Sequence, residues 1–384
     1  MEKKIVMVLL THIDNLPPAR NLIISLLNYN VHIDLITMYS YAIPYEISKN
    51  THIKIYDVQK EIATSKLEAL TNRLKRRHIV RNLVAKLMSS QDILWTVTDY
   101  DAMEVGKLAY NYNHVMQLME LIHDIPYFDE LPFFKAHLYK MGQKAKIVVV
   151  PENNRAHIQQ AYWNLQQTPF VIPNKPNVIK KENYNIEEIS SEAAEVLKKI
   201  GNRKIVLYQG TFGYERVLDQ FIEGVHLLGD DYCVLLMGND CNELQELLKK
   251  YPFVFYVPFI SAPNHLAITS RAYIGILSYV NTNSIRHYDP LNALYCAPNK
   301  IFEYACYGLP MLGNNIPGLD IPFTQYNMGI CCSNLTATEV ANNIRKIEEN
   351  YDEMKNGCFE FYKSVDLDKS VKNVLDELEM EIDI

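Results

Sequence analysis

The sequence predicts an α/β protein made of two doubly wound domains, each a parallel sheet with helices on both faces. Its 384 residues fit two domains at roughly 100–200 residues each. Its composition, 48% hydrophobic and 22% charged, is that of a globular protein. Short apolar runs also alternate with amphipathic stretches of helix length, which is typical of buried parallel strands joined by helices.

The first domain is expected over residues 1–174. Its expected strands are Ile5–Leu10, His32–Thr37, Ile53–Tyr56, Ile93–Val97, Val115–Leu121, Lys146–Val150 and Phe170–Ile172. The helices expected between them are Ala19–Tyr29, Ile62–Met88, Ala102–Tyr112, Leu131–Met141 and Arg155–Leu165. A break at the two prolines of residues 173–176 ends this alternation, because proline stops regular elements.

A polar linker is expected over 175–200, and the second domain over 201–350. The strands expected there are Lys204–Tyr208, Tyr232–Met237, Phe253–Val257, Tyr273–Leu277 and Pro310–Leu312. Two helices are expected to close the chain, Thr338–Asn350 and Tyr351–Ile384. Ligands of doubly wound domains bind at the carboxyl ends of the strands, so we expect a cleft between the two domains.

The chain is expected to be cytoplasmic. Its first apolar run, Ile5–Leu10, is shorter than the roughly 7–15 residues of a signal-peptide core, and no run approaches the ~18–20 residues of a membrane span. All seven cysteines lie in the second half without a C-x-x-C pair, which favours reduced thiols.

Two classes of function are disfavoured by the sequence. A net charge of −7 argues against a nucleic-acid partner. The loop after the first strand, residues 11–18, has no glycine, and no G-x-x-x-x-G-K-[ST] motif occurs, so neither a nicotinamide dehydrogenase nor a P-loop NTPase is expected.

The most informative segment is Pro298–Pro310. Pro298 can begin a helix and Gly308 can end it. The backbone N–H groups near Asn299, with the ammonium of Lys300, would suit a phosphate, and the carboxylate of Glu303 could accept from the two hydroxyls of a ribose. Phosphate beside a vicinal diol indicates a nucleotide. The same residues also allow a plain helix in which Glu303 only complements the dipole.

The segment P-N-K-I-F-E-Y followed by G-L-P resembles the donor-site signature of the family-4 retaining glycosyltransferases, which have the GT-B fold of two Rossmann-like domains facing a cleft. The order of further segments agrees over nearly the whole chain: Leu207–Phe212, Leu236–Asn239 and Phe253–Phe259 resemble the family's donor-domain strands and loops. The resemblance implies that residues 1–174 bind an acceptor, that 201–350 bind a nucleotide sugar, and that 351–384 cross back to the first domain.

By this resemblance Glu303 binds the donor ribose, Lys300 and Asn299 meet the diphosphate, and the loop at Gly210 approaches the sugar phosphate. The full set of expected donor-binding residues is Gly210, Thr211, Phe212, Val257, Tyr295, Pro298, Asn299, Lys300, Ile301 and Glu303.

Two departures from the family pattern stand out. Thr211 replaces the first of two basic residues that often neutralise the diphosphate. Arg216 lies near the second, although it could equally be an exposed helix residue, and Lys300 or Arg271 could supply the missing charge. Tyr295 replaces the first glutamate of the family's pair, so the identity of the donor sugar cannot be carried over.

His123 is the first domain's candidate. Residues 121–126 resemble the family's stretch with a histidine facing the cleft, so His123 could steady the transferring sugar, with Lys300 and Arg216 as the other expected catalytic groups. A buried structural histidine is nearly as well supported. Asp99 and Asp101 imitate a metal-binding D-x-D, but their place before a helix favours a helix cap. No metal or other cofactor is expected to be required.

Residues 66–88 form a basic stretch with leucines at helical spacing. A cationic amphipathic helix of this kind can lie on an anionic membrane, and the expected membrane-facing residues are Arg73, Lys75, Arg76, Arg77 and Arg81. A solvated outer face is the alternative. With this helix, the expected location becomes cytoplasmic, possibly peripheral on the inner face of the cell membrane.

The resulting hypothesis is a retaining glycosyltransferase. It would move a hexose or N-acetylhexosamine from a nucleotide-diphosphate sugar, expected to be UDP-linked, to a glycan or lipid-linked acceptor in cell-surface polysaccharide synthesis. A nucleotide-sugar epimerase of the same fold and a non-catalytic partner subunit remain alternatives.

Overall fold

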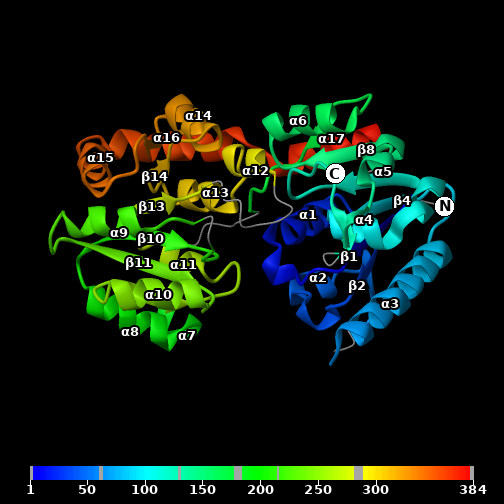
Figure 1. The fold of residues 1–384 in the computed structure, drawn as a ribbon, viewed down its shortest axis with the longest axis horizontal. Coiled ribbons are helices and arrows are strands. Elements are labelled where there is room, and N and C mark those ends of the chain that lie inside the picture. Colours follow the sequence, from blue (N-terminus) through cyan, green and yellow to red (C-terminus); the bar gives the residue numbers. More distant parts are fainter. Residues whose placement is uncertain are drawn as a thin grey trace. The chain divides into compact units, whose positions relative to one another are not determined.

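Two compact units make up the chain in a computed structural model that describes residues 3–59, 64–128, 131–176, 184–213, 216–280 and 289–380. Unit 1 comprises Met1–Asn177, His287–Asp289 and Asp366–Ile384; unit 2 comprises Val178–Arg286 and Pro290–Val365. Figure 1 labels the elements of both units. Parts of the expected linker (177–183) and of the expected last helix (381–384) lie outside the described residues.

Unit 1 contains, within those ranges, a seven-stranded sheet in the order β3-β2-β1-β4-β5-β8-β9, and each neighbouring pair is parallel. The strands are β1 (Ile5–Leu9), β2 (Ile33–Thr37), β3 (Ile53–Asp57), β4 (Ile93–Thr96), β5 (Asn113–Gln117), β8 (Ile147–Val150) and β9 (Phe170–Val171). The helices are α1 (Pro17–Asn28), α2 (Tyr45–Ser48), α3 (Lys66–Leu87), α4 (Asp99–Val105), α5 (Leu138–Lys144), α6 (Asn153–Trp163) and α17 (Leu367–Glu377).

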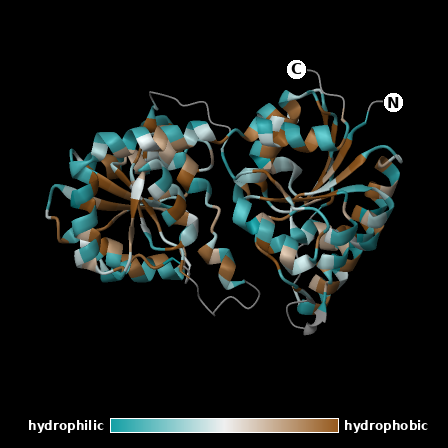
Figure 2. Cartoon of the chain, turned by 90° about the horizontal axis from the view of Figure 1, so that it is seen from above, coloured by the Kyte–Doolittle hydropathy of each residue, from teal (hydrophilic) through white to brown (hydrophobic). Residues whose placement is uncertain are grey.

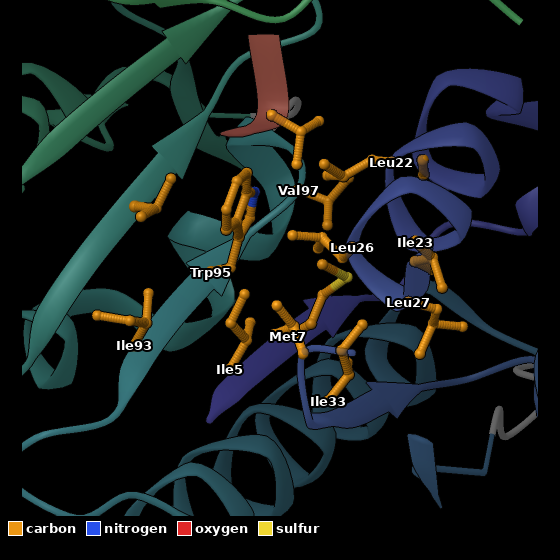
Figure 3. Packing of buried hydrophobic residues seen from close by; sticks show 14 of the residues in the cluster. Ile5, Met7, Leu22, Ile23, Leu26, Leu27, Ile33, Ile93, Trp95 and Val97 are labelled. Atoms are coloured by element: carbon orange, nitrogen blue, oxygen red, sulfur yellow. The ribbon is translucent and has the colours of Figure 1, made fainter. Parts of the chain in front are cut away.

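Successive residues of β1 point to opposite faces of this sheet, as the pleat requires. Ile5 and Met7 pack with α1 and α17 on one face, where Leu22 and Leu26 meet Trp95 of β4 (Figure 3). The side chains between them in sequence pack with α3, α4, α5 and α6 on the other face. Both faces are therefore covered, which explains why the central strands β1 and β4 are apolar along most of their length, whereas the edge strand β3 alternates (Figure 2).

Unit 2 repeats the design with the described strand order β12-β11-β10-β13-β14-β15. Its strands are β10 (Lys204–Gln209), β11 (Tyr232–Gly238), β12 (Phe255–Pro258), β13 (Ile274–Leu277), β14 (Met311–Asn314) and β15 (Gly329–Cys332). Its helices are α7 (Ile186–Ile189), α8 (Ser191–Ile200), α9 (Asp219–His226), α10 (Asn242–Lys250), α11 (Leu266–Thr269), α12 (Pro290–Leu294), α13 (Asn299–Cys306), α14 (Pro317–Tyr326), α15 (Ala337–Glu349) and α16 (Tyr351–Ser364).

Each sheet changes direction of strand order at one place. In unit 1 this is between β1 and β4, and in unit 2 between β10 and β13. Connections leave such a pair of strands toward opposite sides, so a crevice forms outside their carboxyl ends. The fold thus marks one edge of each sheet as the place for a ligand.

Several elements of the structure differ from those expected. Leu131–Met141 is not one helix: β7 (Leu131–Lys135) pairs antiparallel with β6 (Pro126–Phe128), and α5 follows. The expected linker contains α7 and α8, which belong to unit 2. Sequence analysis also did not identify β15, a short strand at the edge of the second sheet.

The C-terminal segment returns to unit 1. The single expected helix is two helices, because Asp366 ends the first region and caps α17 by accepting from the backbone N–H of Lys369 at 2.9 Å. The carbonyl of Asp368 accepts from the Tyr29 hydroxyl at 3.0 Å, and its carboxylate accepts from Ser25. The apolar face of α17 lies in the core beside α1.

Candidate functional site

The crevice of unit 2 is formed by three segments of the chain. Gly210 directly follows β10, Tyr279 follows β13, and the first turn of α13 lies beside them (Figure 1). Asn314, at the end of β14, holds Tyr279 in place: its side chain accepts from the Tyr279 N–H at 2.8 Å and donates to the Tyr279 carbonyl at 2.7 Å. These segments bring together several of the expected donor-binding residues.

Helix α13 begins and ends as its sequence predicts. Pro298 is the N-cap with extended backbone, and Gly308 follows the helix with φ +67°, a conformation that favours glycine. Asn299 and Lys300 are therefore the first two helical residues, whose backbone N–H groups have no partner within a helix. Among these, Pro298 is buried while Asn299 and Lys300 are half-buried.

Two cations lie against aromatic rings at this edge. The Nζ atom of Lys300 is 4.4 Å from the centroid of the Tyr208 ring and 5.6 Å from that of Tyr279. The Cζ atom of Arg216 is 4.0 Å from the Tyr279 centroid. Cation–π contacts of this kind keep positive charge in place without neutralising it. Lys300 and Arg216 therefore both contact the ring of Tyr279.

The backbone conformation at position 210 requires glycine. Its φ of +130° is rare for residues with side chains, and a Cβ atom there would lie 3.0 Å from the Nζ of Lys300. Gly238, at the end of β11, is also required, since its Cβ would come within 2.0 Å of the Gly210 carbonyl oxygen. The backbone is therefore closely packed directly below the Lys300 ammonium.

Glu303 lies one turn into α13 and is only 6% exposed. One carboxylate oxygen accepts from the Gln209 amide at 2.6 Å, and the other is 3.2 Å from the Nε2 atom of His265. Burial alone would raise the pKa of Glu303, yet the charge of His265, the hydrogen bonds from His265 and Gln209, and the charge of Lys300 hold it below its usual value. Glu303 is therefore a buried carboxylate that stays ionised.

The remaining expected donor-binding residues divide into two groups. Thr211 is exposed and Tyr295 half-buried, so both have surface to offer a ligand. Phe212, Ile301 and Val257 instead pack in the hydrophobic cores, and Val257 is fully buried. In this structure Val257 supports the site from behind and does not line it.

Arg271 lies at the wrong edge of the sheet for a diphosphate ligand. It precedes the amino end of β13, whereas Gly210 and Tyr279 follow the carboxyl ends of their strands. Since parallel strands have all their carboxyl ends at one edge, Arg271 is removed from the candidates.

His123 belongs to unit 1 and is exposed on the loop after β5, so the alternative of a buried structural histidine is wrong. Its ring lies 4.9 Å from that of Tyr162, and its carbonyl accepts from the Trp163 indole at 2.9 Å. The loop therefore has a fixed backbone and a solvent-facing imidazole.

The N-cap of α4 is Thr98, and Asp101, one of the two expected cap residues, completes a capping box with it, whereas Asp99 does not cap the helix. The Thr98 hydroxyl accepts from the Asp101 N–H at 3.1 Å, and the Asp101 carboxylate accepts from the Thr98 N–H at 2.9 Å. Asp101 also accepts from the Leu10 N–H at 2.9 Å, which ties α4 to β1. Asp99 is the first helical residue, and burial, with a smaller effect of Glu120, raises its pKa to about 6.

Four of the five expected membrane-facing residues on α3 lie toward α4. Arg77 is 6% exposed and donates to the fully buried Glu104 at 3.1 Å, and Arg73 donates to the same oxygen at 3.0 Å. Arg81 donates to the Glu104 carbonyl at 3.2 Å, and Arg76 donates to the Tyr100 hydroxyl. Of the five, only Lys75 is exposed.

The exposed face of α3 carries leucines instead. Leu67, Leu70 and Leu74 are 72%, 38% and 50% exposed, at a spacing that places them on one side of the helix. Lys66, Lys75 and Lys86 are exposed as well. Over the part of the chain that the structure describes, no helix is both long enough and apolar enough to cross a membrane.

Sequence analysis did not predict roles at the site for Tyr208 and Gln209, the last two residues of β10, and it also missed His265, Thr269 and Tyr279. The latter three come from the loops and the short helix α11 around β12 and β13, and no local motif marks them. His265 interacts with Glu303, Thr269 with Gln209 and Tyr279 with Arg216, and none of these partners is near in sequence. Within the described ranges, no three His, Cys, Asp or Glu side chains are grouped as metal ligands.

Comparison with solved structures shows the GT-B fold. The chain is similar to HepE from Anabaena, solved with UDP and glucose (11% identity, 99% of this chain and 100% of that one, TM-score 0.66). It is also similar to a glycosyltransferase from Rickettsia africae (13%, 98% of both chains, TM-score 0.69) and to sucrose-phosphate synthase from Thermosynechococcus elongatus (15%, 98% of both, TM-score 0.67). No family model and no curated protein matches the sequence.

Proposed function

We propose that this protein is a glycosyltransferase that uses a nucleotide-diphosphate sugar, bound by unit 2. The observation that carries the proposal is the placement of Lys300, Arg216 and the ionised Glu303 around the first turn of α13. Structures of the same fold include HepE in complex with UDP-glucose. We extend the proposal to a UDP-linked hexose or N-acetylhexosamine, transferred with retention to a glycan or lipid-linked acceptor in cell-surface polysaccharide synthesis.

The mechanism follows from the charges at the crevice. Lys300, Arg216 and the N–H groups at the start of α13 would bind the diphosphate and stabilise the negative charge that grows on it as the glycosidic bond breaks. Glu303 would accept from the ribose hydroxyls, for which a carboxylate has spare lone pairs beyond its two present partners. His123 would contact the transferring sugar from unit 1. Because cationic side chains supply the charge compensation, we propose that no metal or other cofactor is required.

A thermal-shift panel of nucleoside diphosphates and their sugars tests the donor site. A ligand at 100 times its Kd stabilises the folded protein by about 2.7 kcal/mol. We expect the uridine compounds to raise the melting temperature of the wild type, and Glu303→Ala to abolish the shift. If no nucleotide shifts the melting temperature, the proposal fails.

Turnover separates the proposed reaction from its rivals. Incubation of the protein with the donor sugar alone leaves the sugar unchanged if an acceptor is needed, whereas an epimerase would convert it. A non-catalytic partner subunit would bind nucleotide without either reaction. The proposed transfer should continue in EDTA, and a strict need for a divalent ion would contradict the metal-free mechanism.

We also propose that α3 lies on an anionic membrane surface, through its leucine face. The expected electrostatic contribution is smaller than the sequence implies, because four arginines are turned toward α4 and about 1 kcal/mol is gained for each basic residue near lipid. Replacing Leu67, Leu70 and Leu74 by glutamine should abolish sedimentation with anionic liposomes, while Leu227→Gln, an exposed leucine of unit 2, should not. Equal binding by both variants would contradict this role.

A further inference from the structure

Glu303 is held by a closed group of four side chains at the carboxyl end of β10. Gln209 donates to its carboxylate at 2.6 Å and in turn accepts from the Thr269 hydroxyl at 2.6 Å. The Thr269 hydroxyl is also 3.4 Å from the backbone carbonyl of His265. His265 completes the group with its Nε2 atom 3.2 Å from Glu303.

Each member of this group has one consistent hydrogen-bonding role. The carboxylate can only accept, so the Gln209 NH₂ must face it, and the Gln209 oxygen is then left for the Thr269 hydroxyl. For the same reason the proton of a neutral His265 must be on Nε2. The Nδ1 atom of His265 is buried and has no hydrogen-bond partner in the described part of the chain.

Gln209 and His265 differ in what they can do for the carboxylate. Both donate a hydrogen bond, but only His265 can add a positive charge. The other cation acting on Glu303 is Lys300, on the same helix, and its effect is smaller than that of His265. Among the described residues, these two are the charged groups found to act on Glu303.

We propose that His265 is a positioning residue that keeps the Glu303 carboxylate ionised and oriented for the hydroxyl donors of a nucleotide ribose. This inference rests on the proposed function for its ligand and extends it, because it predicts nucleotide binding that persists at acidic pH. Without the histidine, only Gln209 and Lys300 would oppose the effect of burial, so the pKa of Glu303 would rise and its carboxyl group would take up a proton at a higher pH, with loss of acceptor capacity.

The first experiment needs no ligand. The carboxyl carbon of Glu303 is followed by ¹³C NMR between pH 3 and 8 in the protein labelled at glutamate, with Glu303→Gln to assign the signal. We expect the titration midpoint to move upward in His265→Gln, because the largest opposing influence on the buried carboxylate is lost. The matched variant His226→Gln changes an exposed histidine of α9 that lies against Phe253, and it should leave the midpoint unchanged.

The second experiment measures the Kd of UDP-glucose by calorimetry between pH 5 and pH 8. Relative to the wild type, His265→Gln should bind within about threefold at pH 8 and progressively more weakly as the pH falls toward 5, since glutamine keeps a donor but not the charge. His265→Ala should lose about tenfold at pH 8 as well. A merely structural histidine would weaken binding equally at every pH.

The two experiments separate the possible failures. If the wild type binds no nucleotide sugar but the Glu303 midpoint moves in His265→Gln, the proposed function fails and the role of His265 in holding the charge stands. If UDP-glucose binds and His265→Gln follows the wild-type profile, the positioning role is overturned. An unchanged Glu303 midpoint in His265→Gln overturns it as well.

Discussion

The basic residues of the two units have different kinds of neighbours. On α3 of unit 1, Arg73 and Arg77 converge on the fully buried Glu104, and so their charges are compensated inside the unit. In unit 2, Lys300 and Arg216 lie over the rings of Tyr208 and Tyr279. A carboxylate cancels a cation, whereas an aromatic face attracts it and leaves its charge.

This difference teaches how to interpret a basic segment. The run of arginines in residues 66–88 looks like a binding surface in the sequence, yet most of it holds α3 to α4. Lys300 and Arg216 of unit 2 are far apart in sequence, and neither belongs to a basic run; their places in the resemblance to the glycosyltransferases are what mark them. What decides between structure and binding is the neighbour that the fold places beside each cation.

The largest expected effect is on stability, from Glu104→Ala. Removing the carboxylate leaves Arg77 buried without its counter-charge, which should lower the free energy of unfolding by about 3–5 kcal/mol. Urea denaturation measures this. The paired variant Glu104→Leu with Arg77→Met should recover part of the loss, because it removes the buried Arg77 charge with the carboxylate, while the partly exposed Arg73 still loses its partner. No recovery in the paired variant would show that the unpaired Arg77 is not the cause.

Unlike Glu104→Ala, Lys300→Ala should have a large effect on the use of the nucleotide sugar and a small effect on the free energy of unfolding. We expect kcat/KM for the nucleotide sugar to fall by about 10²–10³ through the lost charge at the diphosphate. Steady-state kinetics measures this, with Lys249→Ala, an exposed lysine of α10, as the control. Unchanged kinetics in Lys300→Ala would show that Lys300, like the arginines of α3, has a structural role only.

The carboxylate at the corresponding edge of unit 1 should make stability depend on pH. The pKa of Asp99 is raised to about 6 in the folded state, so between about pH 4 and pH 6 the folded protein binds more protons than the unfolded chain. Its contribution to the free energy of unfolding therefore falls as pH rises through that window, by up to about 2 kcal/mol. Asp101, whose pKa burial raises to about 7, contributes a slope of the same sign. Asp99→Asn should therefore reduce the slope in urea titrations at several pH values without abolishing it, and Asp230→Asn, an exposed control, should leave it unchanged.

The smallest of these effects is expected for Arg216→Ala. The Arg216 guanidinium lies against one tyrosine ring and would share the charge of the diphosphate with Lys300. Its loss should therefore weaken UDP binding by about tenfold, or 1.4 kcal/mol. Calorimetry measures this, with Arg345→Ala, an exposed arginine of α15, as the control. A larger loss than in Lys300→Ala would reverse the ranking of the two cations.

Much of the fold could be predicted from the sequence because buried parallel strands carry a strong local signal. The apolar runs of β1, β2, β4 and β10 and the cap residues of α13 are of this kind. The failures lie where the local signal is weak or shared. Gly329–Cys332 begins with glycine and has one β-branched residue, so it does not stand out as a strand. The polar segment before β10 contains α8, whose apolar residues are mostly spaced as one helix face but stand among charged residues, which favours a linker at first sight.

By itself, the sequence determined the doubly wound pattern and the start of α13, with Asn299, Lys300 and Glu303, since these depend on residues close together in the chain. Only the tertiary structure decided which charges are available to a ligand. The imidazole of His265 reaches Glu303 across 38 positions, and Glu104 turns the arginines of α3 inward across about 30. Such pairings are set by how elements pack, because the free energy of a charge depends on its surroundings and not on its place in the chain.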